Sequence, residues 1–295
     1  LENTYILGPM AGVTDLPFRL LCKEQGAGLL CMEMVSAKAI LYNNKNTETL
    51  LEIHPDEQPV SLQFFGSDPQ IMSEMAKRVE ERPFDIMDIN MGCPFPILAK
   101  RHNGSGILPY PEEVKALLSL ITKYPQINFS IKMRLGWEDP EECLKLAPII
   151  NELPLRQVVM HPRLGKQQYK GEVDLKAFEA FQHVCKHPLI YNGDINHIED
   201  IHRIQEQFPG LAGMMIGRGL LANPALALEY KENRTLTPDE MKEKLHIMHT
   251  SVYNQYAAQL EGGDGQLLNK MKTFWEYLAP NADRKLMKAI HKSTS

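Results

Sequence analysis

The stretch FDIMDIN at residues 84–90 is a short apolar run that passes directly into the loop MGCPFP at 91–96. A short apolar run of this kind indicates a strand. Seven further runs of this kind lie along the chain: TYILGPM (4–10), LLCMEMVSA (29–37), VSLQFF (60–65), FSIKMRL (129–135), QVVMH (157–161), PLIYN (188–192) and GMMIG (213–217). We therefore expect eight strands.

Segments with helical spacing separate these runs. Residues 67–81 begin with Ser-Asp-Pro and carry Ile71, Met75 and Val79 on one face. Further helices are expected over 112–123, 140–151, 174–185, 197–207 and 219–229. Regular strand-helix alternation predicts parallel strands with right-handed crossovers, and eight repeats over about 230 residues favour an α/β fold closed as a TIM (β/α)8 barrel. An open doubly wound sheet is the alternative, but the first strand is followed by Gly-Pro-Met-Ala-Gly and lacks GxGxxG.

A second region follows the barrel. The polar stretch KENRTLTPDE at 231–240 reads as a linker that ends in a helix cap at Thr237. Two apolar stripes come next, separated by EGGDG at 261–265: Met241, Leu245, Met248 and Val252, then Leu267, Met271, Phe274, Trp275 and Leu278. We expect a barrel over 1–234 and a small all-helical domain over 235–295.

The composition is that of an ordinary soluble protein, with 43% hydrophobic and 23% charged residues among 295. No apolar run approaches the ~20 residues of a membrane-spanning helix, and the N-terminal residues lack the pattern of a signal peptide, so a cytoplasmic protein is expected. The five cysteines are widely spaced and form no CxxC, which favours reduced thiols and no metal site. We expect a monomer.

The charge does not by itself favour a nucleic-acid-binding protein, because the formal net charge is -5. The distribution is uneven, however. From Lys270 to the C-terminus, six Lys and Arg stand against two Asp and Glu. This basic end is either a solvated helix face or an RNA-binding surface.

In a barrel the active site lies at the C-terminal ends of the strands. The polar and glycine residues expected there are Glu33, Gln63, Asn90, Cys93, Lys132, Arg134, His161, Arg163, Asn192, Gly193, Asp194, Gly217 and Arg218. The tripeptides NGD at 192–194 and GRG at 217–219 suit a phosphate, since glycine lets the backbone approach an anion and arginine can pair with it. Either tripeptide is also typical of a plain turn.

Three of these side chains have competing interpretations. Lys132 could form a Schiff base, stabilise negative charge on a reduced flavin, or pair with Glu33. Cys93 lies in a loop, whereas the other cysteines lie in expected core elements, and a thiol that is protonated near neutral pH can donate a proton. It could equally be a small loop residue without chemistry. His161 could contact a cofactor or be a satisfied structural group.

Seven motifs together resemble the tRNA-dihydrouridine synthase family: GPMAGVTD (8–15), INMGCP (89–94), NGSGIL (103–108), IKMRLGW (131–137), MHPRLGKQQYKGEVD (160–174), YNGDI (191–195) and MIGRGLLANP (215–224). The resemblance covers nearly the whole chain and rests on the order of the motifs along the strand ends. The chain departs from the family pattern at Phe95, Pro96 and Ile97, where a small residue and lysines are usual, and at Pro162.

The resemblance implies an oxidoreductase in which NADPH reduces FMN, and hydride then passes to carbon 6 of a uracil in tRNA while Cys93 protonates carbon 5. Pro9, Met10 and Ala11 would pack on the flavin, Gln63, Lys132 and His161 would lie at its polar edge, and Asn192, Gly193, Asp194, Gly217 and Arg218 would hold its phosphate. Asn90 and Arg134 would contact the uracil. Lys270, Lys272, Arg284, Lys285 and Lys288 would contact RNA phosphates.

Four alternatives remain at this stage. An FMN barrel could reduce a free small molecule, or a dihydrouridine synthase could act on rRNA. The chain could also bind RNA without turnover, or Lys132 could serve an aldolase.

Overall fold

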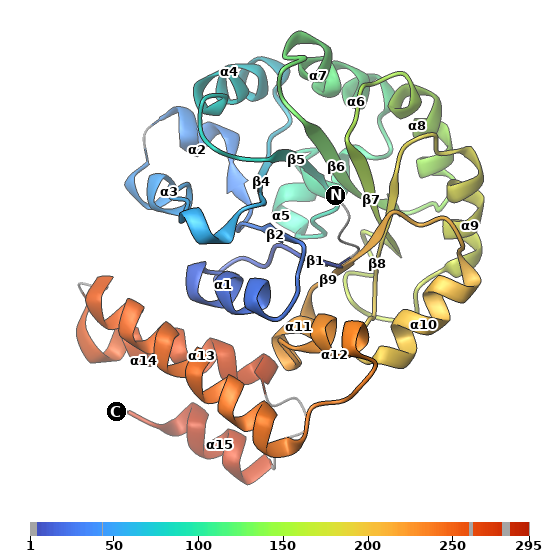
Figure 1. The fold of residues 1–295 in the computed structure, drawn as a ribbon. Helices are drawn as coiled ribbons and strands as arrows, with labels where there is room; N and C mark the ends of the chain where they lie inside the picture. The colour runs from blue at the N-terminus through green and yellow to red at the C-terminus, as the bar shows by residue number, and fades with distance from the viewer. Residues whose placement is uncertain (1–4, 43, 260–261, 279–283, 295) are drawn as a thin grey trace.

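Strand pairing closes the sheet on itself in this computed structural model, which describes residues 5–42, 44–259, 262–278 and 284–294 (Figure 1). Within those residues the barrel strands are β1 (Tyr5–Leu7), β2 (Leu29–Cys31), β4 (Val60–Phe65), β5 (Ile86–Met91), β6 (Phe129–Gly136), β7 (Gln157–Leu164), β8 (Leu189–Asn192) and β9 (Gly213–Ile216). All the pairs are parallel, and closure comes from the pairings of β1 with β9 and of β2 with β4. The predicted TIM barrel is confirmed.

The run at 29–37 does not form one strand as predicted. It contains β2 and a two-residue strand, β3 (Val35–Ser36), which pairs with the far end of β4. Glu33 and Met34 lie between them: the Glu33 carboxylate accepts a hydrogen bond from Gly12 N at 2.6 Å, and Met34 turns into the cavity described below. Side-chain contacts at the barrel mouth thus interrupt an otherwise apolar run.

Helices surround the strands, and one short helix, Pro96–Ala99, lies inside their ring (Figure 1). The helices are α1 (Leu16–Glu24), α2 (Ala37–Leu41), α3 (Lys45–Leu50), α4 (Pro69–Val79), α5 (Pro96–Ala99), α6 (Pro111–Leu118), α7 (Leu120–Lys123), α8 (Glu142–Asn151), α9 (Leu175–Val184), α10 (Ile198–Gln207), α11 (Arg218–Ala222) and α12 (Leu226–Glu232), with 3-10 turns η1 (Pro55–Glu57) and η2 (Gly104–Ile107). The helices expected over 67–81, 140–151, 174–185 and 197–207 are confirmed. Those expected over 112–123 and 219–229 are each divided, the second at Asn223 and Pro224, because proline disfavours a helical residue before it.

Helix α1 was not predicted from the sequence, although its start carries the expected signals. Asp15 is the N-cap, with its carboxylate accepting from Phe18 N, and Pro17 lies in the first turn. The short loop before it holds Gly12 at φ +77°, a conformation that favours glycine.

Side chains alternate along each strand between two environments. One set packs under the helices, for example Ile131 and Met133 of β6. The other set points inside the barrel, where the apolar lower layer consists of Ile6, Leu29, Cys31, Ile86, Val159, Ile190 and Met215. The same alternation places Ser130, Lys132 and Arg134 on the inner side of β6. The period-2 pattern therefore decides which polar residues can meet inside the barrel.

In the described part of the C-terminal region, the barrel is followed by α13 (Pro238–Gln259), α14 (Gly263–Leu278) and α15 (Arg284–Lys292). The cap at Thr237 forms as predicted, since Thr237 Oγ1 accepts from Glu240 N at 3.3 Å and Glu240 Oε2 accepts from Thr237 N at 2.8 Å. Both predicted stripes contribute buried residues, namely Met248, Val252, Leu267 and Met271. The side chains of Phe274 and Leu278 lie outside the described part of the structure.

The helical tail packs against the barrel's outer layer, with α13 beside α1 and α14 in contact with α11 (Figure 1). Its buried apolar residues belong to the same core as those of the barrel helices. The division at residue 234 stays a prediction.

One buried polar contact joins the tail to the first barrel loop. Tyr256 Oη on α13 donates a hydrogen bond to the carboxylate of Asp15, the α1 cap. Burial raises the pKa of Asp15 to about 6, although the Tyr256 and Phe18 hydrogen bonds act in the opposite direction. The folded protein therefore binds a proton at Asp15 more tightly than the unfolded chain does.

This pKa shift predicts a pH-dependent effect of Asp15→Asn. Asparagine keeps an acceptor for the cap but cannot ionise, so it avoids the cost of a buried charge. Between pH 4 and pH 7.5 the stability of the variant relative to the parent should rise by about 2–3 kcal/mol, because wild-type stability falls as pH rises through the folded pKa. Urea unfolding at both pH values measures this difference, and a difference that does not vary with pH would contradict it.

Candidate active site

The C-terminal ends of the strands surround a cavity of about 490 Å³. Every barrel residue to which the sequence assigned a cofactor or substrate role lines this cavity: Pro9, Met10, Ala11, Gln63, Asn90, Cys93, Lys132, Arg134, His161, Asn192, Gly193, Asp194, Gly217 and Arg218. Glu33 and Arg163, which the sequence also placed at strand ends, do not line it. The barrel thus brings together residues spread from position 9 to position 218.

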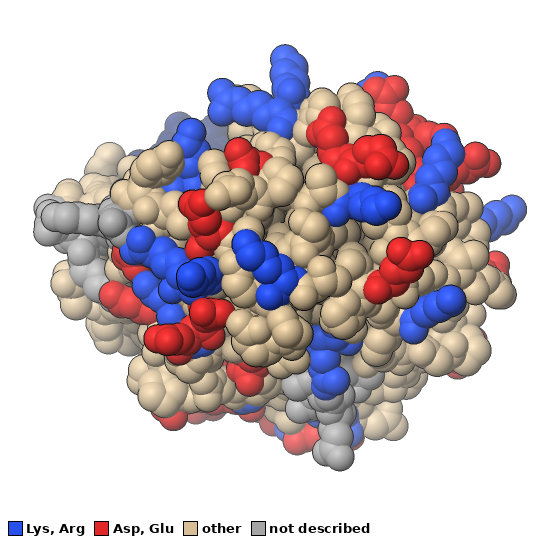
Figure 2. Space-filling view, turned by 90° about the horizontal axis from the view of Figure 1, so that it is seen from above, with Lys and Arg blue, Asp and Glu red and all other residues tan. Residues whose placement is uncertain are grey.

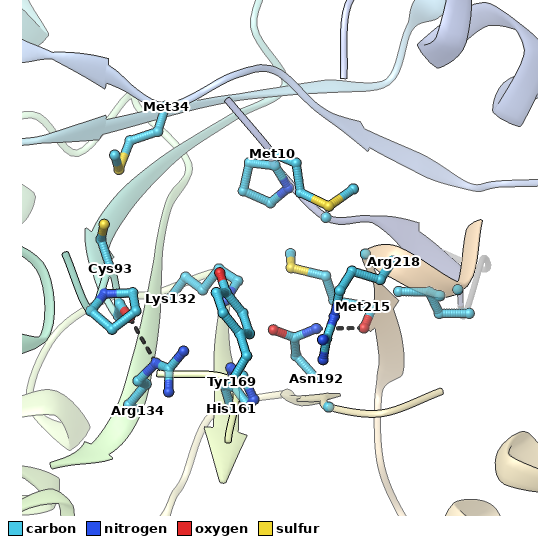
Figure 3. A pocket seen from close by; sticks show the side chains of 18 of the residues that line it. Met10, Met34, Cys93, Lys132, Arg134, His161, Tyr169, Asn192, Met215 and Arg218 are labelled. Atoms are coloured by element: carbon cyan, nitrogen blue, oxygen red, sulfur yellow. Dashed lines mark hydrogen bonds between the residues drawn. The ribbon is translucent and has the colours of Figure 1, made fainter. Parts of the chain in front are cut away.

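Figure 3 shows how these side chains are arranged. Cys93 and Arg134 lie on one side of the cavity, Asn192, Met215 and Arg218 lie on the other, and Tyr169 stands between them (Figure 3). The cavity therefore has a thiol and a guanidinium at one wall and a second guanidinium at the opposite wall.

Lys132 points into the cavity from the middle of β6. The alternative pairing with Glu33 is not formed, because Glu33 binds Gly12 N, and among the described residues no ion pair of Lys132 occurs. Burial lowers the pKa of Lys132 to about 8, and the charge of Arg134 acts in the same direction. Lys132 is thus a partly buried cation whose charge has no direct carboxylate partner.

The loop that carries Cys93 is held at its main chain from both sides. Asn90 Oδ1 accepts from Cys93 N at 2.9 Å, and the Cys93 carbonyl accepts from Ser105 N and Ser105 Oγ, both at 3.0 Å. Gly104 has φ +58°, and a Cβ there would lie 2.5 Å from Cys93 O, so glycine is required. The main chain is fixed while the thiol side chain lines the cavity.

A buried row of hydrogen bonds lies below this loop. Asn90 Nδ2 donates to Gln63 Oε1 at 2.8 Å, and Gln63 Nε2 donates to Asp88 Oδ2 at 2.7 Å. Asp88 also accepts a hydrogen bond from Ser130 Oγ. Burial raises the pKa of Asp88, while these two hydrogen bonds lower it. No role was predicted for Asp88 from the sequence. Gln63, which was predicted to bind the cofactor, is 1% exposed.

His161 is buried and its pKa lies well below the ordinary value, first because of burial and then because of the charges of Arg134 and Lys132. Arg163 Nη1 lies 3.2 Å from His161 Nε2, and because arginine can only donate, Nε2 is the acceptor. The neutral ring therefore carries its proton on Nδ1, which is available as a donor.

Asp194 links two arginines. Arg163, which is 2% exposed, donates from both Nη1 and Nη2 to its carboxylate, and Arg218 Nη2 donates to the same carboxylate at 3.1 Å. Arg163 also donates to Gly171 O at 2.7 Å. Asp194 therefore orients Arg218, and its expected role at a phosphate stays a prediction.

Several lining residues were not assigned roles from the sequence, among them Met34, Tyr169, Asn196 and Met215. Tyr169 is 58% exposed, and its ring centroid lies 5.5 Å from the Arg134 guanidinium and 5.0 Å from that of Arg218. The motif at 160–174 contained it, and an aromatic residue in an otherwise polar loop was a usable signal. The methionines gave no such signal, since methionine is common in cores.

The tail residues expected to contact RNA differ in their surroundings. Lys270 lies over the Tyr256 ring, 5.3 Å from its centroid, while Lys285 and Lys288 are exposed. Lys272 Nζ donates to the carbonyls of His291 and Ser293 at 2.9 and 2.7 Å, so a phosphate would have to compete with the chain's own C-terminal segment. The side chain of Arg284 lies outside the described residues.

Basic and acidic side chains are interspersed on the face drawn in Figure 2, without a continuous basic surface. In the part of the chain that the structure describes, no three His, Cys, Asp or Glu are grouped so as to hold a metal ion. None of the described helices has both the length and the apolar character needed to cross a membrane.

Comparison with solved structures finds the same fold in other proteins. The old yellow enzyme homologue from Zymomonas mobilis superposes with a TM-score of 0.59 at 12% identity, covering 82% of this chain and 95% of that one. Morphinone reductase gives a TM-score of 0.55 at 14% identity over 81% of this chain and 89% of its own. At these identities the likeness extends to the fold alone.

Sequence comparison is more specific. The tRNA-dihydrouridine synthase B of Vibrio cholerae is 32% identical over 271 residues, which are 89% of this chain and 83% of that protein. The tRNA-dihydrouridine synthase B of Vibrio parahaemolyticus is 35% identical over 246 residues, 82% of this chain and 76% of that protein. A family model described as dihydrouridine synthase matches residues 6–293. The chain therefore belongs to the dihydrouridine synthase family.

Proposed function

We propose that this protein reduces uridine in tRNA to 5,6-dihydrouridine, with FMN as its cofactor and NADPH as its reductant. The main structural support is one cavity that combines an excess of basic groups with a cysteine thiol at its wall. The relatives named tRNA-dihydrouridine synthase B support tRNA as the substrate.

The donor set of the cavity fits FMN. Arg218 and the backbone at Gly193 and Gly217 would hold the phosphate, while Lys132, His161 and Gln63 would bind the polar edge of the ring. Gly219 must be glycine in any case, because a Cβ there would lie 2.0 Å from Ile195 O. Met10 and Met215 would supply apolar contacts. When bound, FMN supplies the hydride that reduces the uracil ring.

The protein's own groups have separate tasks in this scheme. Lys132, as a cation with no direct ion-pair partner, stabilises negative charge beside it, and the neutral His161 can donate from Nδ1. Cys93 Sγ donates a proton to carbon 5 of the uracil. Asn90, whose Oδ1 holds the Cys93 loop, lies next to the base.

A uridine must leave its stack to enter a cavity inside a barrel mouth, and this is least costly in a single-stranded loop such as those of tRNA. The tail would bind the surrounding RNA through Lys270, Lys285 and Lys288.

The direct test is the visible absorption spectrum of the purified protein during anaerobic titration. We expect flavin bands that bleach with NADPH and return on addition of unmodified tRNA. Recovery with rRNA or free uridine instead of tRNA would select one of the alternative substrates, and a protein that cannot be loaded with FMN would contradict the proposal.

Replacing Cys93 with alanine removes only the proton donor. Cys93→Ala should keep bound FMN and NADPH oxidation, while tRNA-dependent reoxidation of the flavin falls by a factor of about 10²–10⁴. Rapid-mixing experiments measure flavin reduction by NADPH and flavin reoxidation by tRNA separately. Cys185→Ala, which removes a different thiol, is the control. Equal loss of both half-reactions would argue against proton donation by Cys93.

The lowered pKa of Lys132 predicts that the rate of flavin reduction depends on pH. Because its pKa lies near 8, Lys132 loses its charge as pH rises through 8, and the rate of reduction by NADPH should fall over that interval. Lys132→Ala should be about 100-fold slower at pH 7 and should lack this step, whereas Lys132→Arg should keep its charge to higher pH. A wild-type profile that is flat from pH 7 to 9 would refute the assignment.

The phosphate assignment predicts a selective loss of cofactor affinity. Arg218→Ala should weaken FMN binding by about 1.5–3 kcal/mol, because it removes a charged hydrogen bond, yet change riboflavin binding little. Arg203→Ala, which breaks an exposed pair with Asp200, serves as the control and should change neither. Calorimetric titration of both flavins checks the difference, and equal losses would place Arg218 away from the phosphate.

A further inference from the structure

The row of hydrogen bonds below Cys93 connects the barrel interior to the main chain of the cysteine. It begins at Asp88, which is 2% exposed and does not line the cavity, and passes through Gln63 to Asn90. Asn90 Oδ1 then accepts from Gly92 N at 3.1 Å and from Cys93 N at 2.9 Å. Gln63 of β4 and Asp88 and Asn90 of β5, whose side chains all point inside the barrel, therefore form one continuous row of hydrogen bonds.

Each member of this row constrains the next. An amide side chain has a donor end and an acceptor end, and its orientation depends on its partners. The N–H groups of Gly92 and Cys93 require the oxygen of Asn90, which turns its nitrogen toward Gln63. Gln63 must then present its oxygen to Asn90 and its nitrogen to residue 88. Only an acceptor at position 88 satisfies that nitrogen.

We propose that Asp88 is a positioning residue that, through Gln63 and Asn90, holds the loop bearing the Cys93 thiol in its working geometry. Asp88 touches neither the cavity nor the proposed substrate, so it acts only through its neighbours. The inference rests on the proposed role of Cys93 as proton donor, and it concerns which group orients that donor.

The acceptor, and not the negative charge, is the property that this role requires. Asp88 Oδ2 faces Gln63, and Oδ1 faces the hydroxyl of Ser130, which can donate or accept. An asparagine at position 88 could direct its oxygen to Gln63 and its nitrogen to the Ser130 hydroxyl. The row would then survive loss of the charge.

This distinction defines a matched pair of variants. Asp88→Asn and Asp88→Leu both remove the charge that acts on Lys132, but only Asp88→Asn keeps an acceptor for Gln63. The first measurement is hydrogen exchange at the Gly92 and Cys93 amides in the FMN-loaded protein without RNA. We expect near wild-type exchange in Asp88→Asn and exchange several-fold faster in Asp88→Leu.

The second measurement is the pair of half-reactions. Flavin reduction by NADPH should be the same in the two variants, whereas tRNA-dependent reoxidation should be about 10- to 100-fold slower in Asp88→Leu than in Asp88→Asn, because the proton donor is misplaced. A purely structural role would slow both half-reactions together. Equal exchange and equal reoxidation in the two variants would overturn the proposal.

Two controls keep the test decisive. Ser130→Ala removes the other Asp88 partner, lies off the path to Cys93 and should leave amide exchange unchanged. If Asp88→Leu does not fold, the smaller Asp88→Ala also removes the acceptor and must accelerate exchange at Gly92 and Cys93, and unchanged exchange there would refute the inference. If Cys93→Ala still reduces uridine, the proposed role of Cys93 as proton donor fails while the exchange result stands, so the two failures are distinguishable.

Discussion

Closure of the parallel sheet is the constraint on which the site depends. β1 has only three residues, yet it pairs with both β2 and β9 and completes the ring together with the β2–β4 pairing. Because every strand runs in the same direction, their C-terminal ends meet at one mouth. Residues from the loop after β1 and from the loop after β9 thereby face the same cavity, although some two hundred positions separate them in the chain.

The upper half of the barrel interior carries several positively charged side chains. Lys132, Arg134 and Arg163 lie close together beside a neutral His161, and burial and mutual repulsion lower the pKa values of Lys132 and Arg134. Main-chain carbonyls accept from Arg134, and Asp194 accepts from Arg163. Lys132 is not paired in this way. A cavity with this excess of cations suits an anionic group, which is consistent with the proposed FMN site.

The loop after Cys93 and the basic C-terminal segment are the two parts of the chain that bear on the proposed RNA recognition. The loop after Cys93 presents two apolar side chains to solvent, since Phe95 and Ile97 are 54% and 58% exposed. The basic C-terminal segment is partly occupied by internal contacts, since Lys272 binds the carbonyls near the end of α15. The net charge is -5, and the face drawn in Figure 2 carries mixed charges, so the proposed RNA binding would depend on local geometry on that face.

The sequence by itself determined the order of strands and helices, the closed barrel, and the set of residues at the strand ends. These follow from short-range periodicity and from the direction of parallel strands, so local patterns carry them. The divided helices at Ser119 and at Asn223, the short β3 and the capped α1 were not predicted, because they depend on single-residue effects within otherwise regular runs.

The partners of the polar side chains were decided only by the tertiary structure. Asp88 binds Gln63 and Ser130 across strands that are 25 and 42 positions apart, Glu33 turns to Gly12 instead of Lys132, and Tyr256 reaches Asp15 across 241 positions. A carboxylate can accept from many donors, and the choice depends on strand register and on which groups burial brings within about 3 Å, which a linear pattern does not encode.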